Sequence, residues 1–321
     1  MELDQVEAFV AVIRSGGFTQ ASSALHLSQP AISRRIQLLE RELGAPLFER
    51  LSRGVALTEA GTAFLPHAEA LLASMRDGVA AVAALHGTDR GTVTLALVGT
   101  LASTALTQRL REFRDAHPAV DLRLRTALSA EVSALVRRGD AALGLRYEVD
   151  THPELVSTTI HQERLVPVCA PDHRLARARR VSPRALAGER WIAFPPRPEW
   201  PAEPYSAAVA QALAASGNGA AEIVAIDSLT AQKRMVEAGF GVALLPESSL
   251  DEELRTGTLR TLRVPELRIS VPVVLIHRRR AFHSGATRAL QGILSAPTSP
   301  TPNARRSGAG RSPRTRSPDG A

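Results

Sequence analysis

The sequence has little of what most catalytic and metal sites require. Cys169 is the single cysteine among 321 residues, so no disulfide can form within the chain and no set of cysteines and histidines has the spacing of metal ligands. It contains no Walker A phosphate loop, no HExxH zinc motif and no nucleophile elbow. The sequence therefore gives no basis for an enzyme, and it predicts no cofactor and no metal.

Lysine and long hydrophobic runs are scarce as well. Lys233 stands alone beside 38 arginines, a bias that we attribute to the base composition of a bacterial genome. No apolar run approaches the roughly 20 residues of a membrane-spanning helix, and residues 1–4 do not resemble the start of a signal peptide. We therefore expect a cytoplasmic protein.

The overall composition is that of a globular protein. With 44% apolar and 22% charged residues, a chain of this length has enough apolar side chains for two or three domains with their own cores. Cys169 lies in the apolar stretch 165–170, where we expect a small buried thiol.

Two short helices joined by a tight turn are predicted over residues 18–36. The second helix has Ser28 as its N-cap, Pro30 in its first turn, where the missing N–H costs nothing, and Gly44 as its stop. Four apolar residues recur with the helical period and are expected to form a buried stripe: Ile32, Ile36, Leu39 and Leu43. This pattern is typical of a helix-turn-helix and points to DNA.

The opposite face of the second helix carries short polar groups and a guanidinium. The residues with this spacing are Pro30, Ser33, Arg34 and Gln37. Such groups suit the base edges and phosphates of a major groove. Taken alone, such a face is more often an ordinary solvated helix surface, so the interpretation depends on the flanking segments.

The segments on either side complete a larger DNA-binding unit. A capping box at residues 4–7 predicts a first helix, and its inward stripe consists of Val6, Phe9, Val10 and Ile13. Residues 15–17 stop that helix, and Thr19 is expected to cap the next. Residues 46–58 predict a short hairpin, a wing on which Arg50 and Arg53 meet phosphates.

Residues 3–61 resemble the winged helix-turn-helix of LysR-type transcriptional regulators nearly position for position. The most specific stretches are residues 28–33 (Ser-Gln-Pro-Ala-Ile-Ser) and 47–50 (Leu-Phe-Glu-Arg). In the reading that this resemblance supports, the DNA-binding residues are Thr19, Ser28, Gln29, Pro30, Ser33, Arg34, Gln37, Arg50 and Arg53. The resemblance also implies that two dimers form a tetramer that bends DNA.

Charge alone does not reveal this unit. The chain has a net charge of +7, yet residues 1–60 hold six arginines against seven acidic residues, a net charge of −1. We expect placement to matter more, with Arg34, Arg35, Arg50 and Arg53 on the DNA side. The tail 296–321 carries a net charge of +4 and is rich in proline, serine and glycine, so we expect it to be disordered.

Residues 58–86 predict one long helix. Its apolar residues alternate at three and four positions, the spacing of a coiled-coil seam, and they are Leu65, Ala68, Leu72, Met75, Val79 and Val82. We expect the seam to form a homodimer and Pro66 to bend the helix without ending it. The alternative is a helix packed on its own domain.

Residues 91–295 alternate strands and helices in a βαβαβ order, which predicts a parallel sheet covered on both faces. A second set follows over residues 166–245, with a helix at 208–215, and residues 271–295 return to the first sheet. Two lobes with two crossovers resemble the type 2 periplasmic-binding-protein fold, which is the effector domain of LysR-type regulators.

The expected fold class is therefore α+β multidomain. Its parts are a winged helix-turn-helix (1–60), a linker helix with hinge (61–90), a two-lobed α/β effector domain (91–295) and the tail (296–321). Within the effector domain, we expect one lobe over about 91–163 and 268–295, and the other over about 164–267.

A small-molecule site is expected between the lobes, because ligands of open parallel sheets bind beyond the carboxyl ends of strands, where helix N-termini offer N–H groups to anions. This rule and the resemblance nominate Thr100, Ser103, Ser129, Arg146, Phe194 and Ser228. Each hydroxyl is about as readily a helix cap, and Arg146 either pairs with a carboxylate or makes an internal salt bridge. Trp191 is expected in the core, and Trp200 and Tyr205 beside the cleft.

Together these features predict a ligand-responsive LysR-type transcriptional regulator. The expected partners are a promoter dyad in double-stranded DNA, a small organic acid as effector, further copies of the chain in a dimer and tetramer, and RNA polymerase. An effector that closes the lobes would shift the placement of the DNA-binding pairs. Two other classes stay open, namely a ligand-independent architectural DNA-binding protein and, less favoured, a solute-binding protein.

Overall fold

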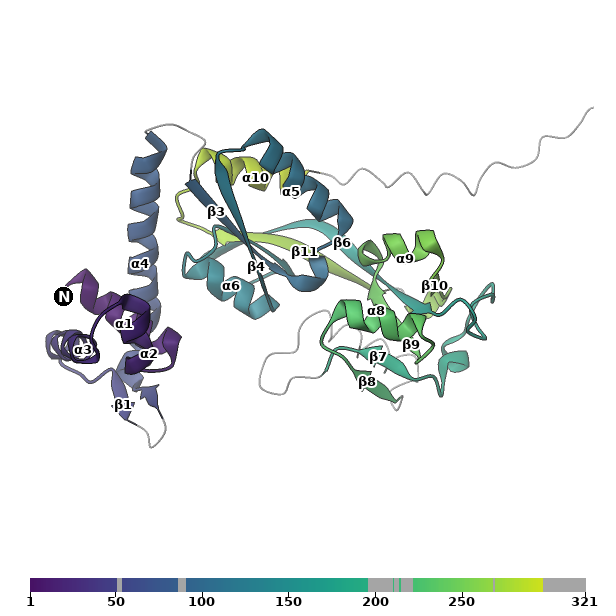
Figure 1. Cartoon of the computed structure of the whole chain (residues 1–321), viewed down its shortest axis with the longest axis horizontal. Helices are drawn as coiled ribbons and strands as arrows, with labels where there is room; N and C mark the ends of the chain where they lie inside the picture. The colour runs from purple at the N-terminus through teal and green to yellow at the C-terminus, as the bar shows by residue number, and fades with distance from the viewer. Residues whose placement is uncertain are drawn as a thin grey trace, which may run out of the picture.

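The computed structural model describes residues 1–50, 54–85, 91–195, 210, 214, 222–267 and 269–296. Along the chain it contains a small helical unit with a hairpin, one long helix, and a two-lobed α/β part (Figure 1). Among the described residues, no helix is both long enough and apolar enough to cross a membrane.

The N-terminal unit consists of three helices and a hairpin. The helices are α1 (Leu3–Ser15), α2 (Phe18–Leu25) and α3 (Gln29–Leu43), and the hairpin pairs β1 (Phe48–Arg50) with β2 (Val55–Leu57) in antiparallel fashion. The predicted helix-turn-helix and wing are therefore present. The tip of the wing, residues 51–53, lies outside the described residues.

Two of the expected helix starts are wrong by two residues. Helix α1 begins at Leu3, where the backbone N–H of Glu2 donates to Gln5 Oε1 at 3.1 Å, so the cap precedes the expected Asp4. Helix α2 begins at Phe18 after Gly17, and Thr19 lies inside its first turn. Neighbouring residues can all cap a helix, and the packing of each helix on the core decides which of them does so.

Helix α3 begins and ends as predicted. The Ser28 hydroxyl accepts a hydrogen bond from Ala31 N at 3.3 Å, and Gly44 takes the left-handed conformation that ends the helix. Ile32, Ile36 and Leu39 are buried. The prediction is wrong for Leu43, which is 41% exposed because it lies in the last turn, beyond the neighbouring helices.

A phenylalanine cluster forms the centre of this unit. The ring of Phe9 is fully buried, and its centroid lies 5.3 Å from the ring centroids of both Phe48 and Phe64. The ring centroids of Phe18 and Phe48 are 5.6 Å apart. The rings come from α1, α2, β1 and the long helix, so one cluster connects the recognition unit, the wing and the linker.

The long helix α4 spans Glu59–Leu85 and contains Pro66 without an interruption. Its expected seam divides into two parts. Ala68 and Leu72 are buried against the core of the N-terminal unit, so the alternative of a helix packed on its own domain holds for the first half. The second half is exposed, with exposed fractions of 66% for Val79 and 58% for Val82.

The first lobe has a parallel sheet, as predicted. Strand β3 (Gly91–Val98) pairs in parallel with β4 (Val120–Ala127) and with β5 (Leu143–Tyr147). Helices α5 (Thr104–Ala116) and α10 (Gly285–Ser295) lie side by side, and α6 (Ser129–Arg137) packs on the sheet away from them (Figure 1). We call this part lobe 1.

Two long strands join the lobes. Strand β6 (Leu155–Cys169) pairs along its length with β11 (Ile269–Arg278) in antiparallel fashion, and β11 returns to lobe 1 beside β5, as expected. Only residues 166–169 of β6 were predicted, because residues 157–164 are polar except for Ile160 and therefore do not form the apolar run that indicates a buried strand.

Lobe 2 is built on the far half of β6. Strands β7 (Trp191–Ala193), β8 (Ile223–Ala225) and β9 (Val242–Pro246) form its parallel part, and β10 (Arg260–Thr261) pairs with β6. Among its described residues, the helices are α8 (Leu229–Glu237) and the short α9 (Asp251–Thr256). The helix expected at 208–215 falls almost entirely outside the described residues, as does the tail 297–321.

Candidate DNA interface and inter-lobe site

Helix α3 presents the polar face that the sequence predicts. Gln29, Pro30, Arg34 and Gln37 are exposed and Ser33 is half-buried, while the reverse face packs on the core. Thr19 is exposed in the first turn of α2, where its carbonyl accepts hydrogen bonds from the hydroxyls of Ser22 and Ser23. A guanidinium and amides thus project from a rigid helix, the arrangement that a major groove accepts.

Arg35 does not belong to this face. Its Nε lies 3.1 Å from Asp4 Oδ2 on α1, so the expectation that it lies on the DNA side is wrong. Successive residues of a helix differ by about 100° in direction. Arg34 therefore points outward, while Arg35 reaches the neighbouring helix.

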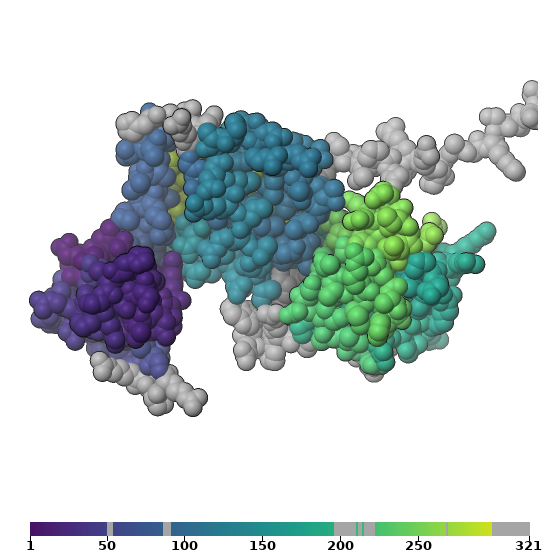
Figure 2. Space-filling view, viewed as in Figure 1, coloured from purple at the N-terminus to yellow at the C-terminus, as the bar shows by residue number. Residues whose placement is uncertain are grey.

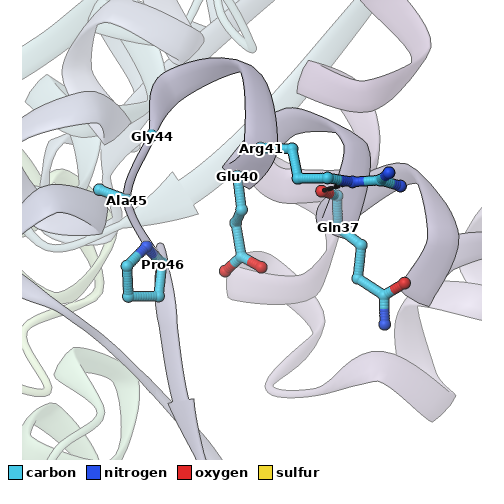
Figure 3. A pocket seen from close by; sticks show the side chains of 6 residues that line it. All are labelled: Gln37, Glu40, Arg41, Gly44, Ala45 and Pro46. Carbon is cyan, nitrogen blue, oxygen red and sulfur yellow. Dashed lines mark hydrogen bonds between the residues drawn. The ribbon is translucent and has the colours of Figure 1, made fainter.

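Arg41 continues the exposed face and was missed by the sequence analysis. It follows Gln37 by one turn, and its Nε donates to the Gln37 carbonyl at 3.3 Å. Both side chains border a shallow surface depression of about 600 Å³ that also includes Glu40 and residues 44–46 (Figure 3). The series Pro30, Ser33, Arg34 and Gln37, continued by one more helical turn, predicts Arg41 on the same face.

The wing is held against α3 by Glu40. Its Oε1 accepts hydrogen bonds from Leu47 N at 2.7 Å and Phe48 N at 3.3 Å. Thr58 closes the other side, because its hydroxyl donates to the Pro46 carbonyl and caps Gly61 N at the start of α4. Arg50 lies at the end of β1, with its backbone paired to Val55, and Arg53 lies outside the described residues.

The nominated small-molecule residues of lobe 1 follow adjacent strand ends. In the register of β3 and β4, Val98 pairs with Ala127, so Thr100 and Ser129 follow neighbouring ends of one sheet edge. Arg146 lies near the end of β5, on the other side of β3. The turn after β3 (Gly99–Leu101) contacts the turn after β9 (Glu247–Ser249) of lobe 2. The strand ends of the two lobes therefore face each other.

The hydroxyls at this junction already have structural partners. Ser103 caps α5 by accepting from Leu106 N at 3.3 Å, and Ser228 caps α8 by accepting from Ala231 N at 3.4 Å. Thr100 Oγ1 lies 2.9 Å from the hydroxyl of the buried Tyr147. Ser129 is the first residue of α6 and is 1% exposed. The helix-cap interpretation therefore holds for Ser103 and Ser228.

Arg146 makes the internal salt bridge that the sequence left open. Its Nη1 pairs with Asp150 and donates to Ser133 Oγ at 2.7 Å, and its Nε donates to the Tyr147 carbonyl at 3.0 Å. Burial would raise the pKa of Asp150, but hydrogen bonds from Ser133 and from the His152 backbone, together with the charge of Arg146, hold that pKa below its ordinary value. The guanidinium is thus fixed beside a carboxylate of its own chain.

The aromatic expectations are tested in part. Trp191 is fully buried in the core, as expected, and Phe194 is half-buried and packs against the same core. Trp200 and Tyr205 lie outside the described residues.

Cys169 is expected to resist thiol reagents in the folded protein. It is fully buried on β6, and burial raises the pKa of its thiol to about 11, so almost none is the reactive thiolate at pH 8. Alkylation by iodoacetamide at pH 8, followed by mass spectrometry, should label it only after unfolding in urea. Rapid labelling of the native protein would show that this strand opens.

Two family models match the chain. One, described as a bacterial regulatory helix-turn-helix protein of the lysR family, matches residues 3–62, and the other, described as a LysR substrate binding domain, matches residues 86–296. The two matches follow each other along the chain in the same order as the two structural units.

Relatives of known name match over nearly the full length. The HTH-type transcriptional regulator TfdS of Cupriavidus pinatubonensis is 31% identical over 281 residues, covering 86% of this chain and 92% of the relative. The structure of full-length CbnR with its target DNA has a TM-score of 0.61 and 26% identity, and the match covers 92% of this chain and 100% of that one. A full-length OxyR variant from Pseudomonas aeruginosa has a TM-score of 0.70 at 17% identity, over 92% and 94% of the two chains, and supports the fold alone.

Proposed function

The chain belongs to the LysR family of DNA-binding transcriptional regulators with an effector-binding domain, and from this premise we propose that it binds an imperfect promoter dyad and responds to a small organic acid. The observation that supports DNA binding is the exposed polar face of α3, because the opposite face of this helix is packed in the core. We further propose that the protein has no catalytic activity and acts in the cytoplasm, where promoters are found.

We assign the DNA contacts by the direction and chemistry of each group. Pro30, Ser33, Arg34 and Gln37 face the base edges, because a helix in the major groove reads bases with its outward side chains. Thr19, Ser28, Gln29, Arg50 and Arg53 fix the register through phosphates, as helix starts and wings commonly do. The similar protein CbnR was solved in complex with its target DNA, which supports DNA as the partner of this chain.

Selection from a random DNA pool by the purified full-length protein tests this assignment. The proposal predicts enrichment of one dyad motif, because base-edge contacts discriminate by about 1–3 kcal/mol per base pair. Retention of DNA without any enriched motif would favour an architectural protein instead.

Dimerisation through the second half of α4 is proposed from its exposed apolar stripe. Leu71, Met75, Val79 and Val82 lie on one side of the helix and expose 37% to 66% of their surface. A stripe of this kind is costly in water and is buried when two helices pair. Association of two such dimers would give a tetramer, and RNA polymerase is the proposed partner at the promoter.

Charging this stripe is expected to separate the dimer. The double variant Val79→Glu/Val82→Glu places two carboxylates in each copy of the seam, where like charges repel and lose water. Analytical ultracentrifugation at micromolar concentration should show a monomer. Ala80→Glu is the matched control, since Ala80 is exposed on the opposite side of the helix, and equal dissociation of both variants would contradict the seam.

The effector class is proposed from the helix starts at the junction between the lobes. Helices α5, α6 and α8 all begin beyond strand ends there, and helix N-termini favour anions. We assign Arg146 a secondary role in binding the effector, because Asp150 already neutralises part of its charge. A panel of small carboxylic acids, screened by thermal unfolding, should contain at least one that raises the melting temperature in a saturable way.

A further inference from the structure

The end of α6 lies against the DNA-binding unit of the same chain. Asp140 Oδ1 is 3.2 Å from Arg14 Nη1 near the end of α1, and Arg14 Nη2 is 3.6 Å from Glu69 Oε1 on α4. Arg138 Nε completes the group, at 3.3 Å from Asp140 Oδ2 and 3.8 Å from Glu69 Oε1. Charged side chains from three distant segments thus meet where α4 runs along lobe 1, and Figure 2 shows the N-terminal unit beside lobe 1 and apart from lobe 2.

Contacts along α4 extend this interface. Arg76 Nη2 donates to the Arg138 carbonyl, and Arg278 Nη2 on β11 lies 2.7 Å from Asp77 Oδ1. Gly139 takes the left-handed conformation, and a Cβ on it would lie 3.1 Å from the Cβ of Ala73. Any side chain at position 139 would therefore crowd α4.

The carboxylates of this cluster depend on their partners. The Glu69 and Asp140 side chains are only 13% and 16% exposed. Burial raises the pKa of Glu69, an effect that the charges of Arg138 and Arg14 oppose. A partly buried carboxylate that loses its partner is strongly disfavoured, so the cluster favours one orientation of the two units over others.

The other end of α6 lies at the junction between the lobes. The helix starts at Ser129, and Ser133 accepts the hydrogen bond from Arg146. Val132 and Val136 are fully buried in the lobe 1 core, so the helix is held firmly. With nine residues it is about 13.5 Å long. One rigid helix therefore connects the nominated effector residues with the DNA-binding unit.

We propose that Asp140 and Glu69 are positioning residues that fix the orientation of the DNA-binding domain on lobe 1, and that α6 relays changes at the inter-lobe junction to this contact. The contact is compatible with the proposed dimer, because Glu69, Ala73, Arg76 and Asp77 lie on the side of α4 opposite to its apolar stripe. The inference rests on the proposed function, since orientation matters only to a protein that places two DNA-binding domains on one dyad.

A double-mutant cycle across the interface tests whether this contact forms in solution. The variants are Arg14→Ala, Asp140→Ala and the two combined, because Arg14 Nη1 and Asp140 Oδ1 lie 3.2 Å apart. We expect the double variant to lower the melting temperature by less than the sum of the two single variants, since residues in contact do not act independently. Strictly additive shifts in folded variants would overturn the contact, whether or not the protein binds DNA.

Operators with altered spacing test whether the contact positions the DNA-binding domains. The probes are synthetic dyads whose half-sites are separated by spacers differing by single base pairs, together with a duplex that carries one half-site. We expect Asp140→Asn and Glu69→Gln to reduce the preference for the best spacer by about fivefold or more, the lower end of typical coupling between sites. Their affinity for the single half-site should stay within about twofold of the wild type.

The controls separate the two levels of the proposal. Asp121→Asn, on the exposed strand β4, where Asp121 accepts hydrogen bonds from Thr92 and Arg123, should leave the spacing profile unchanged. An unchanged profile in Asp140→Asn and Glu69→Gln would overturn the positioning role, whereas loss of all sequence-specific binding by the wild type would overturn the proposed function itself.

Discussion

Replacing Phe9 by alanine is expected to destabilise the DNA-binding domain by about 3–5 kcal/mol. The Phe9 side chain is fully buried and contacts the rings of Phe48 and Phe64, so the substitution leaves a cavity at the point where α1, the wing and α4 meet. Domains of this kind are stable by only about 5–15 kcal/mol in total. DNA binding should therefore be lost at temperatures that the wild type tolerates.

Thermal unfolding followed by circular dichroism measures this effect. We expect an early transition of the N-terminal unit, while the two-lobed domain unfolds as in the wild type, because the cores of the two units are separate clusters. Phe240→Ala is the matched control, since Phe240 is 51% exposed in a turn of lobe 2. Equal shifts in the two variants would contradict the assignment of Phe9 to the centre of the core.

Replacing Arg34 by alanine is expected to weaken binding to the operator by about 1–3 kcal/mol, which is about 5- to 150-fold, and to relax discrimination at one position of each half-site. Arg34 is exposed on the outward face of α3, and a guanidinium there can bind a guanine edge bidentately. Binding to a set of operators with each base pair replaced in turn measures both effects. Losses should be largest for the wild-type sequence and small for the operator already altered at that position.

Arg35→Ala is the matched control for Arg34→Ala. Arg35 is the next residue on the same helix, but its guanidinium pairs with Asp4. Loss of such a partly exposed pair costs about 0–1 kcal/mol of stability and should leave base preference unchanged. If both variants lose affinity equally for every sequence, Arg34 contacts the backbone and does not read bases.

The parts that could be predicted from sequence have local signals. Ser28, Pro30 and Gly44 define the recognition helix through the chemistry of helix ends, and these hold in the structure. Most strands and helices of the two lobes follow from hydrophobic period and length, but the first part of β6, helix α9 and strand β10 do not. The starts of α1 and α2 were misplaced because Glu2 and Asp4, or Gly17 and Thr19, can each begin a helix.

The parts that could not be predicted depend on contacts between distant residues. The spacing of the α4 seam does not say what covers it, and its first half packs on the N-terminal core while the second is exposed. Arg34 and Arg35 are neighbouring arginines on one helix, and the sequence does not show that only Arg35 lies close enough to Asp4 to form an ion pair. Arg14 and Asp140 are 126 residues apart, and nothing local in either segment indicates that they pair.

A footprint of the purified protein on the DNA upstream of its own gene, with and without each compound of a panel of small organic acids, tests the central claim most directly. The account predicts protection of a dyad whose length or internal cleavage pattern changes with at least one compound, in a saturable way. Protection that no compound alters would contradict an organic acid as the effector, and the absence of any protected sequence would contradict specific DNA binding at this site.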